Sequence, residues 1–354
     1  MTRRISYHPF IIKLLNWEYW PFCILYGPIL IYWLYLSIKA RSFFFFNTSN
    51  PTIGNGGFMM ESKWDIYKLL PKEYYPNTLI FKGGLNEKIV TNIIKRHKFH
   101  YPLIGKPDIG LKGMSVKKLE SEYDLIEYVK YSKVHFLIQE FVPYPNEVGI
   151  FYYRYPNQQL GHISGIVSKE FLSVKGTGYS TIKELLQQEK RYVLQLPILA
   201  RSYGEQLNRV LVKGEELILV PYGNHVRGAK FIDASDLIDE RLTETIDEVC
   251  KRVDGFFYGR LDIRYNTWEE LREGKNFSII ELNGAGSEPT HIYDPKHSIL
   301  FAWKEIIRHW TILWKISRMN HHKQARPYMK TISGLKMLRE NNTYIKKISE
   351  TKRA

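Results

Sequence analysis

Four polar side chains in the second half of the sequence have the types and spacing of a magnesium and phosphate site; they are Arg260, Asp262, Glu281 and Asn283. The first two lie in the run 259–265 and the last two in the run 277–283. Two carboxylates and a carboxamide are hard oxygen ligands for an Mg²⁺ ion that also keeps waters and binds nucleotide phosphates. An arginine among them can stabilise charge on a transferring phosphoryl group. A hairpin with solvated charges is the alternative interpretation.

Two strands must position these side chains. Both runs alternate apolar and polar residues with period two, and the segment 266–276 between them is rich in charge and contains a glycine. This pattern predicts two antiparallel strands. Since residues two apart in a strand share a face, we expect the four side chains to meet on one face of the pair.

A second group of residues suits phosphate binding. Residues 101–116 are predicted to form an apolar strand that ends at Lys106, followed by a glycine-rich loop. The loop contains Gly110, Lys112, Gly113 and Ser115. Backbone N–H groups and two ammonium groups can surround phosphates here. The spacing is neither that of a P-loop nor that of a dinucleotide fingerprint, and a structural glycine-rich hairpin is the alternative.

The apolar run 135–142 predicts another strand, which runs into Pro143. Its end could offer backbone groups to an adenine. Glu147, beyond this end, could bind ribose hydroxyls.

In the order and approximate spacing of these groups the chain resembles the ATP-grasp superfamily, in particular the carboxylate-amine ligases related to D-alanine:D-alanine ligase. The similarity covers about residues 60–300, and the Arg-x-Asp and Glu-x-Asn pair is its most specific part. By that resemblance, ATP would be bound by Lys63, Lys106, Gly110, Lys112, Gly113, Ser115, Glu140, Phe141, Val142 and Glu147. Two Mg²⁺ ions, or Mn²⁺ in their place, would be bound by Asp262, Glu281 and Asn283. Arg260 would stabilise the acyl-phosphate and tetrahedral stages of the reaction.

The sequence also departs from the ligase pattern. These ligases usually begin with a separate α/β domain that helps bind the first substrate, whereas the sixty residues before Glu61 are too few for such a domain and largely hydrophobic. The segment 284–291 also differs from that of the dipeptide ligases, so the resemblance does not supply the identity of the amine.

The segment 221–230 gathers Asn, His, Arg and Lys around two glycines after an apolar strand. Such a group could bind a phosphate or a carboxylate through Arg227 and Lys230, with His225 as a general base for an amine. A solvated loop with a hydrogen-bonded structural histidine is the alternative.

Charge and cysteine content narrow the function classes. The net charge of +15 is concentrated at the ends: residues 1–41 carry five Lys or Arg and one acid, and residues 315–354 carry eleven and two. A nucleic-acid enzyme more often has positive charge across its working surface, so no nucleic-acid partner is expected. The two cysteines give no disulfide framework and fit a reducing compartment.

Residues 19–38 carry no formal charge, and as one helix they would be about 30 Å long, which is the thickness of a hydrocarbon core. Pro21 and Pro28 favour a kink, so spanning, re-entrant and interfacial arrangements stay open, and a buried core helix is the alternative. With the basic ends, this pattern predicts that a single hydrophobic N-terminal segment associates with the cytoplasmic face of an anionic membrane, and that the substrate is lipid-linked or part of the cell envelope.

The predicted fold class is α+β, an ATP-grasp fold of two lobes with ATP between them, preceded by a membrane-associated helix. The predicted domains are a hydrophobic segment (1–45), a linker (46–60), a small lobe (61–146), a large lobe (147–318) and a basic tail (319–354), which is either a short helix or disordered. The predicted activity is that of an ADP-forming ligase, in which a small-molecule or lipid-linked carboxylate is activated as acyl phosphate and joined to an amine. An ATP-grasp kinase and a non-catalytic, membrane-tethered nucleotide-binding protein are the alternatives.

Overall fold

The computed structural model describes residues 7–110, 113–323 and 325–351. Within this part of the chain, contacts divide the residues into two compact units. The smaller unit contains residues up to Ile31, Val167–Ala234 and Thr290–Glu305, and the larger unit contains Tyr32–Ile166, Ser235–Pro289 and the residues from Ile306 onward. The described residues form both helices and sheets, which confirms the predicted α+β class. The predicted domain boundaries stay predictions.

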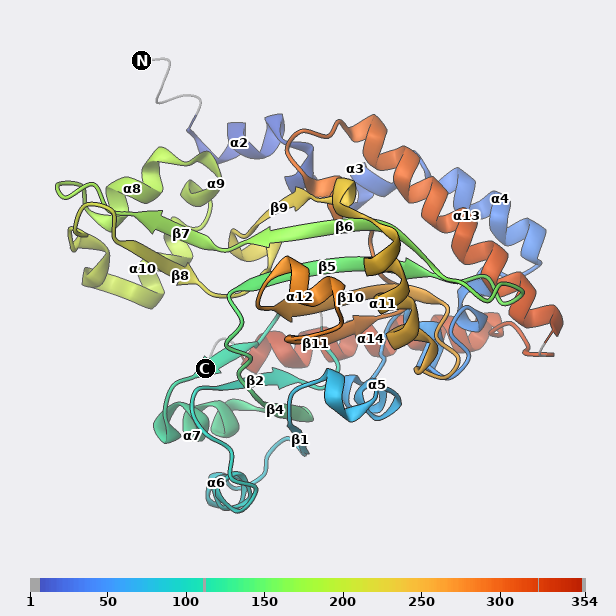
Figure 1. Ribbon diagram of the computed structural model, residues 1–354, viewed down its shortest axis with the longest axis horizontal. Helices are drawn as coiled ribbons and strands as arrows, with labels where there is room; N and C mark the ends of the chain where they lie inside the picture. The colour runs from blue at the N-terminus through green and yellow to red at the C-terminus, as the bar shows by residue number, and fades with distance from the viewer. Residues whose placement is uncertain (1–6, 111–112, 324, 352–354) are drawn as a thin grey trace. The chain divides into compact units, whose positions relative to one another are not determined.

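The first sheet of the larger unit has four antiparallel strands in the order β1-β4-β2-β3. The strands are β1 (Thr78–Phe81), β2 (Leu103–Pro107), β3 (Lys117–Leu119) and β4 (Phe136–Glu140). Two helices, α6 (Glu87–Arg96) and α7 (Glu122–Tyr131), lie beside this sheet in Figure 1 and share its apolar core. Each begins where a polar side chain accepts a hydrogen bond from the first turn, Asn86 for α6 and Ser121 for α7.

The second sheet contains the predicted hairpin. Its strands run in the order β11-β10-β5-β6-β9, with β5 (Asn146–Tyr153), β6 (His162–Glu170), β9 (Lys230–Asp233), β10 (Tyr258–Tyr265) and β11 (Phe277–Asn283). The larger unit contains β5, β10, β11 and the first part of β6, together with α11 (Glu240–Lys251) and α12 (Trp268–Arg272). The pairing of β10 with β11 is antiparallel, so the hairpin prediction is confirmed. A capping box of Thr267 and Glu270 begins α12 between the two strands.

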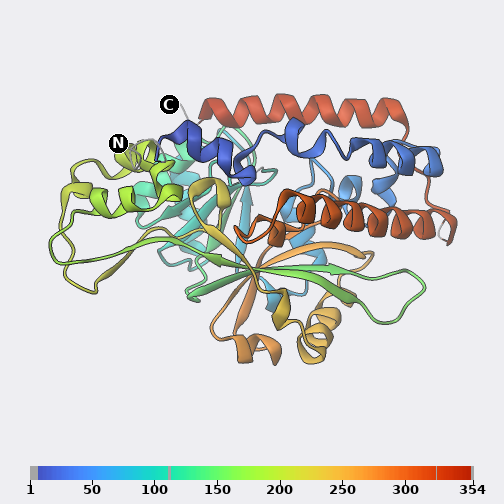
Figure 2. The same cartoon turned by 90° about the horizontal axis from the view of Figure 1, so that it is seen from above.

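The remaining elements of the larger unit are mostly helical. They are α4 (Leu30–Ala40, from Tyr32 onward), η2 (Phe45–Thr48), η3 (Gly54–Gly57), α5 (Lys63–Leu69), η4 (Lys72–Tyr74), η7 (Ser235–Leu237), α13 (Ile299–Lys323, from Ile306 onward) and α14 (Thr331–Thr351). One core cluster joins α4, the phenylalanines before and within η2, β10, α13 and α14. Figure 2 shows α13 and α14 as two long helices in orange-red and red. Helix α13 begins shortly after Pro295, and the basic tail, predicted as a short helix or disordered, is largely the helix α14.

The smaller unit has its own core. Its elements are α2 (Pro9–Leu15), η1 (Trp17–Tyr19), α3 (Phe22–Tyr26), β7 (Leu172–Lys175), α8 (Ile182–Gln188), α9 (Lys190–Val193), α10 (Leu196–Tyr203), η5 (Gly204–Asn208), β8 (Glu216–Val220), η6 (His225–Arg227), β9 and η8 (Thr290–Tyr293). Strands β7 and β8 pair antiparallel, and leucines from these strands and from α8, α10 and η5 form the main apolar cluster.

The prediction of one membrane-associated helix over residues 19–38 is wrong. The segment is divided among η1, α3 and α4, because Pro21 precedes α3 and the Gly27–Pro28 pair ends it. In the part of the chain that the structure describes, no helix is both long enough and apolar enough to cross a membrane. Helix α4 instead buries Trp33, Leu36 and Ala40 in the core of the larger unit. This contradicts the predicted localisation at the cytoplasmic face of a membrane, and the reason for expecting a lipid-linked substrate or an anionic membrane partner falls with it.

Candidate active site

The predicted ligand residues are brought together by the register of the hairpin. Asp262 of β10 lies opposite Glu281 of β11, and Arg260 lies opposite Asn283. Directly opposed residues of an antiparallel pair point to the same face, so these four side chains form one cluster. A β-bulge follows Asp262, where the register shifts before Ile263. Bulges of this kind redirect side chains at the point where they occur.

Arg260 and Asp262 form a two-pronged ion pair on this face. The Nε atom of Arg260 lies 3.0 Å from one carboxylate oxygen of Asp262, and its NH2 group lies 3.1 Å from the other. The remaining nitrogen donates to the backbone carbonyl of Glu288 at 3.3 Å. Burial by itself lowers the pKa of Arg260, but the charge and hydrogen bonds of Asp262, together with the charges of Glu281 and Glu288, more than offset this, so the pKa lies above its ordinary value. A fixed, charged guanidinium therefore lies beside the carboxylates.

Lys106 reaches the same site from β2. Its ammonium group donates to the Tyr67 hydroxyl at 2.8 Å, to the Gln139 side-chain oxygen at 2.8 Å and to the carbonyl of Ile280 at 3.1 Å. Ile280 directly precedes the predicted ligand Glu281, so these bonds fix Lys106 next to it. Burial lowers the pKa of Lys106 to about 7, against an opposite effect of the Glu281 charge.

Lys63 approaches Glu281 from α5. Its Nζ atom lies 3.4 Å from a Glu281 oxygen, and a Cβ atom added at Gly110 would lie 3.3 Å from the same Nζ. Burial lowers the pKa of Lys63, but the carboxylates of Glu281 and Glu61 raise it by more, so the pKa lies above its ordinary value. Lys63 thus pairs with Glu281 next to the start of the glycine loop (residues 110–115), while Lys106 binds the residue that precedes Glu281.

Asp108 positions Lys63 and was not among the predicted residues. Its carboxylate accepts hydrogen bonds from the Ser62 hydroxyl at 3.0 Å and from the Trp64 N–H at 2.9 Å. The N–H of Lys63 donates to the Asp108 carbonyl at 3.1 Å. Asp108 is buried and directly follows β2, so it ties the start of α5 to the strand that carries Lys106.

Glu61 is a second residue of the cluster that was not among the predicted site residues. Burial raises its pKa, and the charges of Lys63 and Glu281 act on it from nearby. One of its carboxylate oxygens is buried and has no hydrogen-bond partner among the described residues. The cluster therefore contains a third carboxyl group beside the two predicted metal ligands.

The predicted donor set consists of oxygen atoms, which suit Mg²⁺. Asp262 and Glu281 offer carboxylate oxygens from opposed positions, and the side-chain amide oxygen of Asn283 would be the third donor. Among these residues, no group of three or more His, Cys, Asp or Glu side chains is arranged to hold a metal ion. The predicted set has only two carboxylates, completed by an amide, and phosphate oxygens and waters would supply the other ligands.

The residues predicted to bind the nucleotide base and sugar lie in the larger unit with partners of their own. Glu140 accepts a hydrogen bond from the Asn77 side chain at 2.9 Å, and the Lys118 ammonium lies 4.7 Å from the centre of the Phe141 ring. Glu147 is buried and forms an ion pair with Arg264 at 3.3 Å. A role of Glu147 in binding ribose stays a prediction, and so do the roles of Phe141 and Val142.

Two residues of the glycine loop have left-handed backbone conformations. Gly113 and Ser115 both have positive φ angles, of 68° and 56°. The Tyr128 hydroxyl of α7 donates to the Ser115 carbonyl at 3.1 Å, which holds this strained turn. Lys112, also predicted to contact phosphate, lies outside the described residues.

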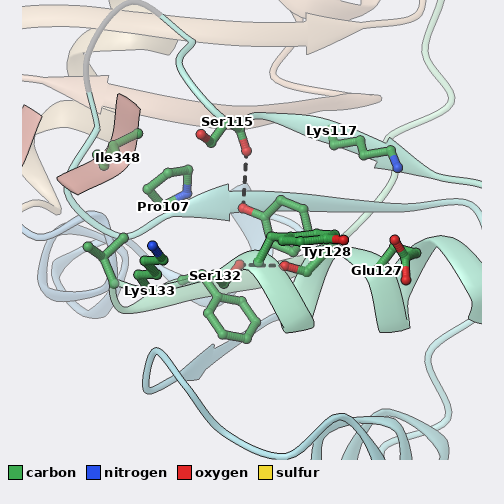
Figure 3. Close-up of a pocket in the computed structure, with 11 residues that line it drawn as sticks. Pro107, Ser115, Lys117, Glu127, Tyr128, Ser132, Lys133 and Ile348 are labelled. Carbon is green, nitrogen blue, oxygen red and sulfur yellow. Dashed lines mark hydrogen bonds between the residues drawn. The ribbon is translucent and has the colours of Figure 1, made fainter. Parts of the chain in front are cut away.

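A cavity of about 240 Å³ lies against this turn. Figure 3 shows Ser115, Tyr128 and Pro107 around it, with Ile348 of α14 on another side. The side chain of Tyr128 extends from α7 and donates its hydroxyl to the carbonyl of Ser115. The C-terminal helix thus contributes to the surroundings of the glycine loop.

His225, Arg227 and Lys230 belong to the smaller unit, where each has its own surroundings. The Nε2 atom of His225 lies 2.8 Å from the Glu18 carboxylate, and the Arg227 guanidinium lies over the Tyr222 ring at 5.3 Å. Lys230 is exposed, 3.8 Å from Glu170.

Glu18 was not among the predicted residues, although it is the single acid among residues 1–41, and that isolation in the sequence could have indicated a specific role. Gln139 could likewise have been found as a polar residue inside the apolar strand β4.

No protein-family model and no curated protein sequence matches the chain. Among solved structures, it is similar to a bifunctional glutathione synthetase from Pasteurella multocida, at 14% identity and a TM-score of 0.37, over 69% of this chain and 35% of that one. It is similar to the VanG D-Ala:D-Ser ligase from Enterococcus faecalis at 14% identity and a TM-score of 0.41, over 72% and 61% of the two chains. The D-alanine–D-alanine ligase from Bacillus anthracis matches at 14% identity and a TM-score of 0.38, over 74% and 67%. The chain thus spans about a third of the first relative and about three fifths of the second. The three solved structures are thus a glutathione synthetase and two ligases, each at 14% identity.

Proposed function

We propose that this chain is an ATP-grasp ligase that uses ATP to activate a carboxylate and joins it to an amine. The observation that carries the proposal is that Lys106, Lys63 and Arg260 lie with the carboxylates of Asp262 and Glu281 in one largely buried cluster. Concentrating so much buried charge is costly unless a ligand of high charge binds there. A nucleotide triphosphate with Mg²⁺ has the required charge and the required oxygen ligands.

The chain's own residues would act mainly by position and charge. Lys106 and Lys63 would hold the phosphates as point charges, and the backbone of the glycine loop would close over them. Asp262, Glu281 and Asn283 would hold Mg²⁺, which when bound neutralises charge on the phosphate oxygens. Arg260 would stabilise the negative charge that moves during transfer, from a guanidinium already fixed by Asp262.

The proposed reaction has two steps. A carboxylate oxygen of the first substrate attacks the γ-phosphorus of ATP, and ADP leaves with the electrons of the broken bond. The nitrogen of an amine then attacks the carbonyl carbon of the acyl phosphate, inorganic phosphate leaves, and the amine loses a proton. We propose small-molecule acids and amines as the substrates. That Arg227 and Lys230 hold a substrate carboxylate or phosphate, and that His225 assists the amine, stays a prediction.

The experiment is to incubate the full chain with ATP, Mg²⁺ and mixtures of carboxylic acids, with hydroxylamine as a general amine. A ligase gives ADP, phosphate and a hydroxamate whose mass identifies the acid. Omission of hydroxylamine tests for an ATP-grasp kinase, which would release a stable phosphorylated product without any amine. Absence of nucleotide binding by the purified chain would contradict the proposal at its first step.

A further inference from the structure

The N-terminal part of the chain is anchored in the smaller unit by one carboxylate. Glu18 lies in η1, and its side chain is 10% exposed. The NH2 group of Arg191 lies 2.8 Å from one oxygen of Glu18 and 2.6 Å from the other. The Nε2 atom of His225 lies 2.8 Å from the second oxygen. Both oxygens of this carboxylate are therefore bound, by an arginine 173 residues away and a histidine 207 residues away in the sequence.

Aromatic side chains close this site on several sides. The Tyr19 ring lies 5.7 Å from the Arg191 guanidinium and 5.8 Å from the His225 ring. Trp17 stacks on Tyr293 at 5.6 Å, and its indole N–H donates to the carbonyl of His297 at 3.0 Å. The three residues 17–19, which we name the clasp segment, are thus held by both polar and apolar contacts.

The partners of Glu18 are connected to the loop 221–230. His225 is a member of that loop, and Arg191 donates a further hydrogen bond to the carbonyl of Ala229 at 3.2 Å. Burial raises the pKa of Glu18, but the hydrogen bonds and charges of His225 and Arg191 together lower it by more, so its pKa is below the ordinary value. A charged carboxylate therefore links the clasp segment to a loop that contains the predicted anion-binding residues Arg227 and Lys230.

We propose that Arg191 and His225 form a carboxylate-binding site which Glu18 fills from within the chain, so that the clasp segment fixes the loop 221–230. An arginine that contacts both oxygens, a histidine and two aromatic walls are the groups that recognise a free carboxylate in solution. In this protein the N-terminal segment supplies that carboxylate. Glu18 is accordingly a positioning residue of the loop, and this role does not depend on the proposed ligase activity.

The test compares the trypsin sensitivity of the loop in the full-length parent and in Glu18→Ala, with the cut sites located by mass spectrometry. We expect cleavage after Arg227 to become at least about tenfold faster, because removing one partner of a buried ion pair leaves the others uncompensated. Cleavage after Arg209, whose side chain is 60% exposed in the same unit, is the internal reference and should not change. Glu170→Gln is the matched control, since Glu170 is 59% exposed and lies near Lys230 of the same loop.

Chemical rescue distinguishes a carboxylate site from a general loss of structure. Added acetate should slow the cleavage after Arg227 in Glu18→Ala, whereas acetamide, which has a similar shape but no charge, should not. If Glu18→Ala fails to fold and is cut everywhere, Glu18→Gln and Arg191→Lys provide the test, because both keep the size of the side chain and lose the paired geometry. Parental cleavage rates after Arg227 in these variants, or an acetate effect equal to that of acetamide, would overturn the proposal.

Discussion

At the residue scale, the candidate site depends on how two lysines are kept close to each other and to carboxylates. Lys63 is stabilised in its charged form by Glu281 and Glu61, whereas Lys106 has neutral partners, the Tyr67 hydroxyl, the Gln139 amide and a backbone carbonyl. Hydrogen-bond acceptors without a full charge do not offset the desolvation of an ammonium group. The two lysines therefore differ in pKa although they contact the same short segment of β11.

This difference predicts a pH dependence of ATP binding. Lys106 has a pKa lowered to about 7, so it is charged below that pH and neutral above it. Since the phosphates bind the charged form, the ATP affinity should fall as the pH rises from 7 to 9, by up to about tenfold per pH unit. Nucleotide titration at several pH values measures this effect. In Lys106→Met the affinity should be weaker and this pH dependence should disappear, whereas Lys118→Met, a change at a half-buried lysine of β3, should retain it. An equal slope in all three proteins would contradict the assignment of the titrating group.

The two predicted metal ligands give a second prediction at this scale. Asp262→Asn and Glu281→Gln each remove a charge that Mg²⁺ and the phosphates require, so the turnover of ATP should fall by about 10² to 10³ or more. Circular dichroism should show that the fold is retained. Glu269→Gln, which changes an exposed glutamate of α12 in the same hairpin connection, should turn over ATP at the parental rate. Normal ATP consumption by either ligand variant in the presence of substrate would remove these residues from the metal site.

At the scale of elements, the loop after β11 is held by a segment more than two hundred residues earlier. The N–H groups of Ala285 and Gly286 donate to the carbonyls of Gly56 and Gly57 at 2.9 and 2.8 Å. A Cβ atom at Gly57 would lie 2.6 Å from the Cα atom of Gly284, so the two backbones can approach only because both residues are glycine. The turn 54–57 therefore fixes the backbone that directly follows Asn283.

Asn50 connects this turn to the start of β10 and provides a third prediction. Its amide group donates to the carbonyls of Gly56 and Tyr258 and accepts from the N–H groups of Phe257 and Tyr258, all at 2.8 to 3.0 Å in a fully buried position. Asn50→Ala removes these four hydrogen bonds from a buried position and should reduce the free energy of unfolding by about 3 kcal/mol or more. Denaturant unfolding measures this loss, with the exposed Asn92→Ala on α6 as the control that should change little. A loss below about 1 kcal/mol would mean that water replaces these bonds.

At the scale of the molecule, the C-terminal helix connects distant parts of the larger unit. Gly334 of α14 lies on the ring of Phe44, where an added Cβ would come within 2.4 Å, and Met337 is buried in the core cluster with α4 and α13. Near the other end, Ile348 lines the cavity beside the glycine loop, and the Tyr344 hydroxyl lies close to the backbone of Ile109. The helix therefore contacts both the core around α4 and the surroundings of the phosphate-binding residues.

A fourth prediction follows from the burial of Met337. Met337→Ala should lower the free energy of unfolding by about 2 to 5 kcal/mol, because it leaves a cavity in a packed core. Lys336→Ala, at the neighbouring exposed position, is the matched control and should stay within about 0.5 kcal/mol of the parent. If both variants have the stability of the parent, α14 does not pack as described.

The sequence by itself determined the local features. The period-two runs predicted β10 and β11 and the shared face of Asp262, Glu281, Asn283 and Arg260, because alternation is a property of the strand itself. The apolar residues after Pro295 likewise recur with helical periodicity, and this region of the chain is α13.

Only the tertiary structure decided which partners the charged residues have and what covers the apolar segments. Lys106 donates hydrogen bonds to Gln139 and Ile280. Glu147 forms an ion pair with Arg264, and His225 is hydrogen-bonded to Glu18. In each case the partners lie far apart in the sequence. Hydropathy described residues 19–38 as apolar, but it could not say whether lipid or protein would cover them. Short-range patterns record which side of an element avoids water, whereas the group that lies on that side depends on how the whole chain packs.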